Sequence, residues 1–411
     1  MICMMMKNIK VITIFLVMAL TTASLQVAMA QKKGNAQNAQ TQRQNKPSTR
    51  SKPSNKQQNQ SLKLPKRQTQ KTKVTLPEPT KNSVLTGEAK SYFAPATAGD
   101  VEAQYNLGRC YYLGGYGVEE NGAEAIKWLT KAADHDHCGA IYYLALCYQD
   151  GFGVDQSESA AKKHFNKAYN IAMSLAKQGD LMAMHVMGWT YDHGRGYVEE
   201  NNSVAVEWYS KAANAGFAPA QFDLGVCYEE GEGVARNMEK AYLWYRKAAE
   251  QGDSDAQLSL GICYEFGEGV DKDLYLASKW YAKAAEQGNA AAQCNLGDLY
   301  YDGEGVSQSY NQAVNWYRKA AEQGYDEAQN CLGYCYEEGH GVSKNMVLAY
   351  GWYKKAAEQG HDVAQTNLGL CYWNGSGVKK NTKKAIEWWQ EAARQGNEDA
   401  RQFLEEEGLS W

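Results

Sequence analysis

The 411-residue sequence has little proline, and it lacks the short motifs of the common enzyme classes. Five of the seven prolines lie between residues 31 and 83, and no G-x-S-x-G, phosphate-loop or H-E-x-x-H motif occurs. Those motifs mark hydrolases, nucleotide-binding proteins and zinc proteases, so their absence argues against these classes. No nucleophile or carboxylate pair is identifiable either. The sequence therefore predicts a protein that is not an enzyme, with no catalytic, cofactor-binding or metal-binding residue.

A long apolar run is also missing at the N-terminus. VITIFLVMAL (11–20) falls short of the roughly 20 residues that a membrane-spanning helix needs. It follows Lys7 and Lys10 and precedes VAMAQ, in which Ala28 and Ala30 have A-x-A spacing. This order predicts a signal peptide (1–30) cleaved after Ala30, with an uncleaved anchor as the alternative. No cysteine directly follows the run, so a diacylated lipoprotein is not indicated. The protein is predicted to be exported, to the periplasm or outside the cell.

Aromatic residues are absent from residues 31–84, where Gln, Asn, Lys, Ser and Thr dominate. Such a segment cannot bury enough apolar surface to offset the entropy of ordering, so a disordered linker is predicted. Up to residue 83 it carries thirteen Lys or Arg against the single Glu78, a net of +12, whereas the following residues carry a net of −18. The basic tail is either a binder of an anionic envelope surface or a solvated spacer.

The rest of the sequence is repetitive. EQGDSDAQLSLGICYEFGEGVDKD begins at Glu250, and EQGNAAAQCNLGDLYYDGEGVSQS begins 36 residues later at Glu286. The first three repeats are longer than 36 residues. One residue enters GGYGV (114–118) of the first repeat and another enters GRGYV (194–198) of the third, while NIAMSLA adds about two turns to the second helix of the second repeat. The landmark residue of each unit is Leu107, Leu144, Met187, Leu224, Leu260, Leu296, Leu332, Leu368 or Leu404.

Each unit has the apolar spacing of two amphipathic helices joined by a glycine-rich turn. The spacings i, i+4, i+7 and i+8 place one face of a helix together, as at Ala256, Leu260, Cys263 and Tyr264. The N-caps predicted for the second helices are Asn121, Ser157, Asn201, Asn237, Asp273, Ser309, Asn345 and Asn381. The residues predicted to end them are Gly179, Gly216, Gly252, Gly288, Gly324, Gly360 and Gly396, with Asp136 as the exception.

The aromatic pairs of the second helices are predicted to form the core, because one helix pair alone cannot hide so wide an apolar face and stacking buries it. His164 stands where repeat two lacks the Trp, and it is interpreted as a packing residue rather than a ligand. The tryptophans assigned to the core are Trp208, Trp244, Trp280, Trp316 and Trp352.

The pattern A-Q-x-x-L-G-x-x-Y-x-x-G-x-G-V, followed by A-x-x-W-Y-x-K-A-A-x-x-G, resembles the Sel-one-like repeat (SLR) family of tetratricopeptide-like αα-solenoids. The resemblance implies an all-α fold: a right-handed αα-superhelix of eight helix-turn-helix repeats (100–396) plus a C-terminal half repeat (397–411). A capping helix is expected at 85–99. The resemblance also implies an adaptor that holds protein or peptide partners, and we expect a monomer.

Cysteine occupies one repeat position six times, and the same position holds Thr190 and Leu299 elsewhere, so it accepts a small or apolar side chain. Equivalent helices of neighbouring repeats are expected to lie farther apart than the roughly 7 Å limit for a disulfide. Free thiols are therefore predicted. This departs from the cysteine-rich secreted branch of the family, in which each hairpin carries a bridge. The six are Cys110, Cys147, Cys227, Cys263, Cys335 and Cys371.

Two local patterns suggest ligands but have simpler interpretations. DHDHC (134–138) contains ligand types that suit zinc, although His- and Asp-rich turns are commonly only solvated. GEGV (231–234) superficially resembles a phosphate-binding loop, but its relatives recur between two helices with no preceding strand, which favours a turn.

Function is expected where the repeats differ. By the tetratricopeptide analogy, three positions of each first helix face a concave groove, and rings and charges there would bind a partner. The leading hypothesis is an exported, non-catalytic scaffold for a protein or peptide, without nucleic acid. The alternative is an envelope hydrolase of cell-wall or β-lactam type, or a glycan-binding protein. The predicted partner-binding residues are Tyr105, Arg109, Tyr112, Tyr142, Leu146, His185, Trp189, Phe222, Glu229, Glu265, Tyr301, Tyr334 and Trp373.

Overall fold

The computed structural model describes residues 85–410; the predicted signal peptide and the predicted linker lie outside the described residues. The described part is all-α, and its only β pairing is an isolated bridge. Its helices are α2 (Gly87–Thr97), α3 (Val101–Leu113), α4 (Gly122–Ala133), α5 (Cys138–Asp150), α6 (Glu158–Ala176), α7 (Leu181–His193), α8 (Asn202–Asn214), α9 (Ala218–Glu230), α10 (Met238–Glu250), α11 (Ser254–Phe266), α12 (Leu274–Glu286), α13 (Ala290–Asp302), α14 (Tyr310–Glu322), α15 (Asp326–Glu338), α16 (Met346–Glu358), α17 (Asp362–Asn374), α18 (Thr382–Arg394) and α19 (Glu398–Glu406).

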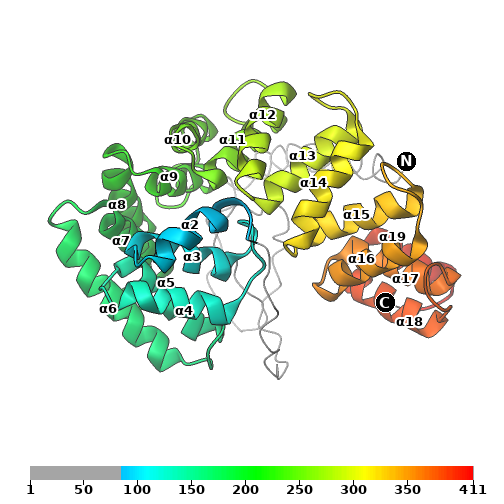
Figure 1. Ribbon diagram of the computed structural model, residues 1–411, viewed down its shortest axis with the longest axis horizontal. Helices are drawn as coiled ribbons and strands as arrows, with labels where there is room; N and C mark the ends of the chain where they lie inside the picture. Colours follow the sequence, from blue (N-terminus) through cyan, green and yellow to red (C-terminus); the bar gives the residue numbers. More distant parts are fainter. Residues whose placement is uncertain (1–84, 411) are drawn as a thin grey trace, which may run out of the picture. The chain divides into compact units, whose positions relative to one another are not determined.

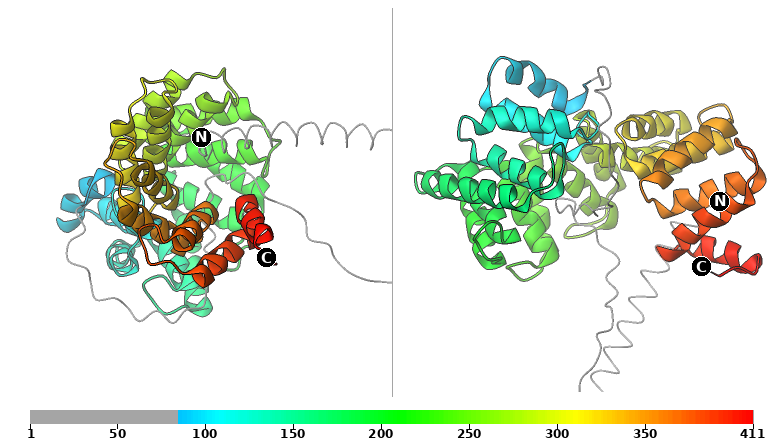
Figure 2. Two further views of the ribbon diagram at one scale, coloured as in Figure 1. Left: turned by 90° about the vertical axis from the view of Figure 1, so that its right-hand side faces the viewer. Right: turned by 90° about the horizontal axis from the view of Figure 1, so that it is seen from below.

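Consecutive helices pack in antiparallel pairs, and each pair packs on the next to form a right-handed superhelix (Figures 1 and 2). We number the pairs as repeats one (α3–α4) to eight (α17–α18). The predicted all-α solenoid is thereby confirmed. The second helix of repeat two, α6, has 19 residues where the other second helices have 12 or 13, as the added NIAMSLA segment predicted. Helix α2 lies before repeat one, within the range predicted for the capping helix, and packs on α3.

The helix ends confirm the sequence-based caps. All eight predicted N-cap side chains accept a hydrogen bond from a backbone N–H in the first turn of the following helix. The predicted glycines after the second helices have positive φ, and Asp136, the exception, is the one non-glycine residue of 85–410 with positive φ, at 56°. An L-residue in this region is strained, which is why glycine occupies the other copies.

The tyrosine of each Trp-Tyr pair, not the tryptophan, fills the core. Tyr209, Tyr245, Tyr281, Tyr317 and Tyr353 are at most 2% exposed, whereas the five tryptophans assigned to the core are half-buried. In each of these five repeats the lysine three residues after the tryptophan lies over its ring, with Nζ 3.7–4.2 Å from the centroid. The prediction that these tryptophans are core residues was therefore wrong, because they border solvent and their outer face is covered by a cation.

The glutamine of the A-Q dipeptide links neighbouring helices through a repeated hydrogen-bond pattern. Gln257 is buried; its Nε2 donates to the Ala249 carbonyl at 3.2 Å, and its Oε1 accepts from Gln287 Nε2 at 2.8 Å. The same two bonds recur at Gln221, Gln293, Gln329 and Gln365. A buried amide must satisfy its polar atoms, so this arrangement explains why the motif specifies glutamine.

Among the helices of residues 85–410, none combines the length and apolarity that crossing a membrane requires. The nine cysteines of this range are free, eight of them buried, which confirms the prediction for the six repeated thiols.

Candidate functional site

The first helices of the repeats line the inner side of the superhelix. Helix α3 contacts α5, and α5 contacts α7, although a second helix lies between them in sequence. Further along, polar side chains join first helices directly, as where Asn367 Nδ2 donates to Asn330 Oδ1 at 3.0 Å. Helices on the inside of a curved array approach one another more closely than those outside. The first helices therefore carry the candidate surface, as the sequence analogy expected.

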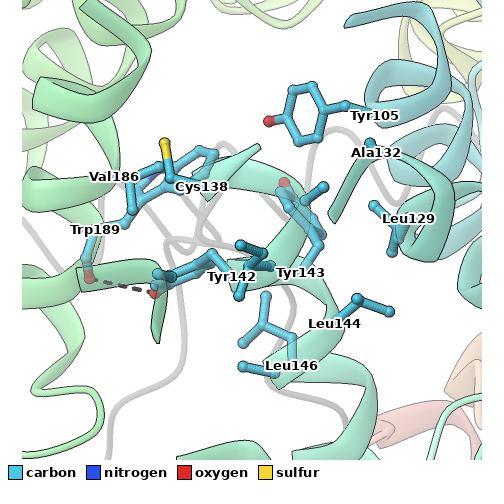
Figure 3. Packing of buried hydrophobic residues seen from close by; sticks show 14 of the residues in the cluster. Tyr105, Leu129, Ala132, Cys138, Tyr142, Tyr143, Leu144, Leu146, Val186 and Trp189 are labelled. Atoms are coloured by element: carbon cyan, nitrogen blue, oxygen red, sulfur yellow. Dashed lines mark hydrogen bonds between the residues drawn. The ribbon is translucent and has the colours of Figure 1, made fainter. Parts of the chain in front are cut away.

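Six of the thirteen predicted partner-binding residues are buried, at most 9% exposed. Figure 3 shows Tyr142 against Trp189, with the Tyr142 hydroxyl donating to the Trp189 carbonyl at 3.3 Å. A partner could not reach these side chains without opening the core. The expectation that they form an accessible groove is corrected, because rings this large fill the gap between adjacent first helices. They are Tyr105, Tyr142, Leu146, His185, Trp189 and Phe222.

His185 and Trp189 share one acidic partner in the next repeat. His185 Nε2 lies 2.6 Å from Asp223 Oδ2, and Trp189 Nε1 donates to the same oxygen at 2.9 Å. The ring centroids of His185 and Trp189 are 4.2 Å apart. These contacts join α7 to α9, so the three side chains hold repeats three and four together.

The two predicted glutamates accept hydrogen bonds from core tyrosines. Glu265 Oε2 accepts from the Tyr281 hydroxyl at 2.6 Å, and Glu229 accepts from the Tyr245 hydroxyl. Burial raises the pKa of Glu229, against the lowering effect of the Tyr245 bond. Both carboxylates are half-buried and satisfied within their own repeat. A partner that used them would compete with these bonds.

Two further predicted residues, Arg109 and Tyr112, make polar contacts around repeat one. The Tyr112 hydroxyl donates to Asp150 Oδ2 at 2.8 Å, and burial together with this carboxylate raises the Tyr112 pKa. Arg109 Nη2 lies 3.8 Å from Glu88 Oε2, and the guanidinium lies 5.6 Å from the centroid of the Tyr116 ring.

The start of helix α2 and repeat one touch repeats five and six through a set of contacts that we call the closure. It joins Thr86–Glu88 and the turn Gly114–Val118 to Asp255, Gln287–Ala290 and Gln323. The Glu88 N–H donates to the Gln287 carbonyl at 2.7 Å, the Ala290 N–H to the Gly115 carbonyl at 2.9 Å, and the Gly117 N–H to Gln323 Oε1 at 2.5 Å. The Tyr116 hydroxyl donates to Asp255, at 2.8 Å from Oδ2. The turn GGYGV, which is one residue longer than the equivalent turn of most other repeats, thus contacts residues that are more than 100 positions away in the sequence.

The closure gathers three carboxylates around one guanidinium. Glu88, Asp253 and Asp255 all interact with Arg109, and all three have raised pKa values. Burial, followed by the Asp255 carboxylate, raises the pKa of Asp253 to about 7. One cation cannot neutralise three half-buried anions that lie close together, so the folded protein takes up a proton at a higher pH than the unfolded chain does.

This cluster predicts that the protein loses stability between mildly acidic and mildly alkaline pH. The folded pKa of Asp253 lies above its unfolded value of 3.8, so its contribution is complete below about pH 4 and is lost as the pH rises through about 7. The melting temperature at about pH 5 is expected to exceed that at about pH 8.

Asp253→Asn is the matched variant, because asparagine already caps the equivalent helix at Asn289 and Asn397. Thermal unfolding followed by circular dichroism is expected to show a smaller difference between the two pH values in this variant. An unchanged difference would assign the effect to other groups, such as His361, whose pKa is raised against the effect of its burial by a hydrogen bond to Glu327.

The last three predicted residues remain partly accessible on the inner side of repeats six to eight. Tyr301 and Tyr334 lie at the boundary of repeats six and seven, and Trp373 follows in repeat eight against Trp389, with centroids 5.2 Å apart. The Tyr301 hydroxyl lies 2.7 Å from His340 Nδ1, and the His340 ring stacks on Tyr310 at 4.6 Å. We name Tyr301, Tyr310, Tyr334 and His340 the aromatic patch.

Sequence reasoning found half of this patch. Tyr310 and His340 were missed because the search was restricted to three positions of the first helices, whereas Tyr310 begins α14 and His340 lies in the turn after α15. The sequence did contain a sign of His340, because this turn reads GHGV (339–342) where several other repeats read GEGV.

The other histidine-containing candidates have structural roles. His164 stacks on Tyr148 with centroids 5.1 Å apart, and burial lowers its pKa. In DHDHC, His137 caps α5 by accepting from the Ala140 N–H at 3.1 Å, while Asp134, His135 and Asp136 are exposed. Within residues 85–410, the side chains of DHDHC do not form a group whose potential ligand atoms lie close enough together to hold one metal ion.

The Sel1 repeat family matches the chain eight times, at residues 101–137, 139–170, 181–217, 218–253, 254–289, 290–325, 326–361 and 362–397. The fold and these matches agree repeat by repeat. The chain belongs to the Sel1 repeat family, which confirms the resemblance seen in the sequence. Proteins with such repeats typically bind other proteins.

Two solved structures resemble this one over much of its length. A protective antigen with an SLR fold from uropathogenic Escherichia coli is 35% identical, with a TM-score of 0.50, covering 76% of this chain and 65% of that one. A Sel1 repeat protein from Oxalobacter formigenes is 35% identical, with a TM-score of 0.53, covering 61% and 96% of the two chains.

Curated relatives include chitin synthase regulatory factor 2 of Schizosaccharomyces pombe and the chitin synthase regulator SKT5 of Saccharomyces cerevisiae. The first is 34% identical over 133 residues, 32% of this chain and 25% of the relative. The second is 32% identical over 166 residues, 39% and 23% of the two chains. The matched region therefore spans about a quarter of these relatives.

These relatives contradict the location expected from the N-terminal sequence. Their names describe regulators of chitin synthase in yeasts, which does not agree with an exported periplasmic protein. The expectation of a periplasmic or extracellular protein was therefore wrong. It depended on residues 1–30 alone, where an apolar run behind two lysines was interpreted as an export signal.

Proposed function

We propose that this protein is a non-catalytic scaffold that binds a protein or peptide partner on the inner surface of repeats six to eight. The aromatic patch is the observation that carries the proposal. Its four rings are half-buried, so a partner can cover the rest of their surface. Binding hot spots are rich in tyrosine and tryptophan because such rings give a large contact area at a low cost in side-chain entropy. Trp373 extends this surface into repeat eight.

The relatives support a regulatory role over a catalytic one. They match 32% and 39% of this chain, and their names describe regulators of an enzyme. A scaffold of this kind would bring an enzyme or its regulator to the inner surface of the superhelix. The monomeric state and a binding role for the 31–84 tail stay predictions.

Tyr301→Ala with Tyr334→Ala is expected to weaken the capture of the cognate partner by at least about 30-fold, because one hot-spot ring contributes about 2 kcal/mol or more. The measurement is affinity capture from extract of the source cells by the tagged full chain, followed by titration of the purified partner. Circular dichroism checks that the variant is folded.

The matched control is Tyr242→Ala with Tyr264→Ala. This is a second half-buried tyrosine pair, whose hydroxyls lie 3.1 Å apart at repeats four and five. The control is expected to retain partner binding. Equal loss in both variants, or full binding by the patch variant, would contradict the proposed surface.

A further inference from the structure

Two thiols and a carboxylate meet at the boundary of repeats six and seven. Cys294 and Asp298 lie one turn apart on α13, and Cys331 lies on α15. Their ligand atoms, two Sγ and one carboxylate oxygen, all lie within 4.8 Å of one another. Within residues 85–410, this is the one group of three or more such side chains that could hold a metal ion.

The geometry of the array brings the two cysteines together. Cys294 is two residues before the landmark Leu296, and Cys331 is one residue before Leu332. The same two positions of adjacent repeats meet elsewhere as the His185–Asp223 and Asn330–Asn367 pairs. The contact is thus a regular feature of the repeat boundary, and at this boundary both positions carry thiols.

The surroundings suit a cation. The thiols hydrogen-bond to each other, and the carboxylates of Asp298, Glu327 and Asp326 lie near them, so acidic groups surround the site. The Tyr317 hydroxyl donates to Asp298 Oδ1 at 2.7 Å and so orients the carboxylate.

We propose that Cys294, Asp298 and Cys331 bind a thiophilic divalent cation of the zinc class. Zinc takes thiolate and carboxylate ligands in a tetrahedron, and Zn–S bonds of about 2.3 Å place two sulfurs about 3.8 Å apart. Two thiolates select zinc over magnesium or calcium, which prefer oxygen. Binding forms two metal–sulfur bonds and one metal–oxygen bond and releases two thiol protons to solvent. A fourth position stays open for water or for a partner's side chain.

Such an ion would connect repeat six to repeat seven beside the aromatic patch. Cys331 precedes Tyr334 by one helical turn on α15. Sequence reasoning missed the group because Cys294 and Cys331 stand 37 residues apart and outside the repeated cysteine position. The inference does not depend on the proposed function, since metal binding is measured on the protein alone.

The test is a cobalt(II) titration of the full chain with a non-thiol reductant present, followed by zinc displacement. The expected result is one cobalt ion per chain, with thiolate charge-transfer and tetrahedral visible absorption that zinc abolishes. Cys294→Ser and Cys331→Ser are each expected to abolish the absorption. Tyr317→Phe is expected to weaken binding by about 10-fold, because it removes the group that orients a ligand.

Cys227→Ser with Cys263→Ser is the matched control, since both thiols are buried at the repeated position. This control is expected to bind cobalt as the parent does. No absorption by the reduced parent protein, or equal absorption after either ligand cysteine is replaced, would overturn the proposal. Circular dichroism of each serine variant separates loss of ligands from loss of folding.

Discussion

Replacing Tyr281 by alanine is expected to lower the free energy of unfolding by about 3–5 kcal/mol, the usual cost of removing a large buried ring. The Tyr281 side chain is 0% exposed, and its hydroxyl donates to Glu265. Its ring also packs directly on Gly261, where an added Cβ would lie 2.4 Å from Cε1. The ring thus fills a space that no neighbour can occupy. Urea unfolding followed by circular dichroism measures the effect.

The adjacent Trp280 supplies the control from the same helix turn. Its ring is half-buried and lies beneath Lys283 Nζ at 3.7 Å, so Trp280→Ala is expected to cost roughly half as much, about 2 kcal/mol. Tyr281→Phe keeps the ring and loses the hydrogen bonds of the hydroxyl to Glu265 and Asn295, at about 1 kcal/mol each. An equal or larger loss at Trp280 would reverse the order of these two positions.

The difference between Tyr281 and Trp280 shows what the apolar pattern of a single helix cannot predict. The spacing of Trp280 and Tyr281 places both on the apolar face, and both rings of the pair were predicted to lie in the core. Which of two adjacent residues points inward depends on the angle at which the first helix crosses, and the small Gly261 opposite Tyr281 fixes that angle. The glycine of the L-G pair was visible in the sequence, but its partner 20 residues away was not.

Local signals predicted the fold well because each depends on a few neighbouring residues. The N-cap side chains, the glycines after the second helices and the added turns of α6 are all of this kind. The candidate surface was predicted less well because its residues are separated by whole repeats. The positions two residues before and two residues after the landmark were expected to face a groove, yet large rings at these positions, such as Tyr142 and Trp189, pack against each other. Only curvature decides which of them remain accessible.

Replacing Gly288 by alanine is expected to break the closure contacts to repeats five and six. This is the second of the two largest effects that we expect. A Cβ at residue 288 would lie 2.9 Å from the Gly117 nitrogen and 3.1 Å from the Gly87 Cα, so the backbone of repeat one must move. Four hydrogen bonds then weaken, at about 1 kcal/mol each. The amides of Glu88, Gly117 and Ala290 are expected to exchange at least about 10-fold faster, measured by hydrogen–deuterium exchange with mass spectrometry.

Gly252→Ala is the control that isolates the closure from backbone strain. Gly252 occupies the equivalent position one repeat earlier, with φ of 102° against 99° at Gly288, and a Cβ there meets nothing within 4 Å. Both variants carry the same penalty for an L-residue with positive φ, so only the long-range contact differs between them. Faster exchange at Glu88 and Gly117 in the Gly288 variant alone would establish that repeat one is held against repeats five and six. Equal exchange in the two variants would mean that these glycines act only through the local helix end.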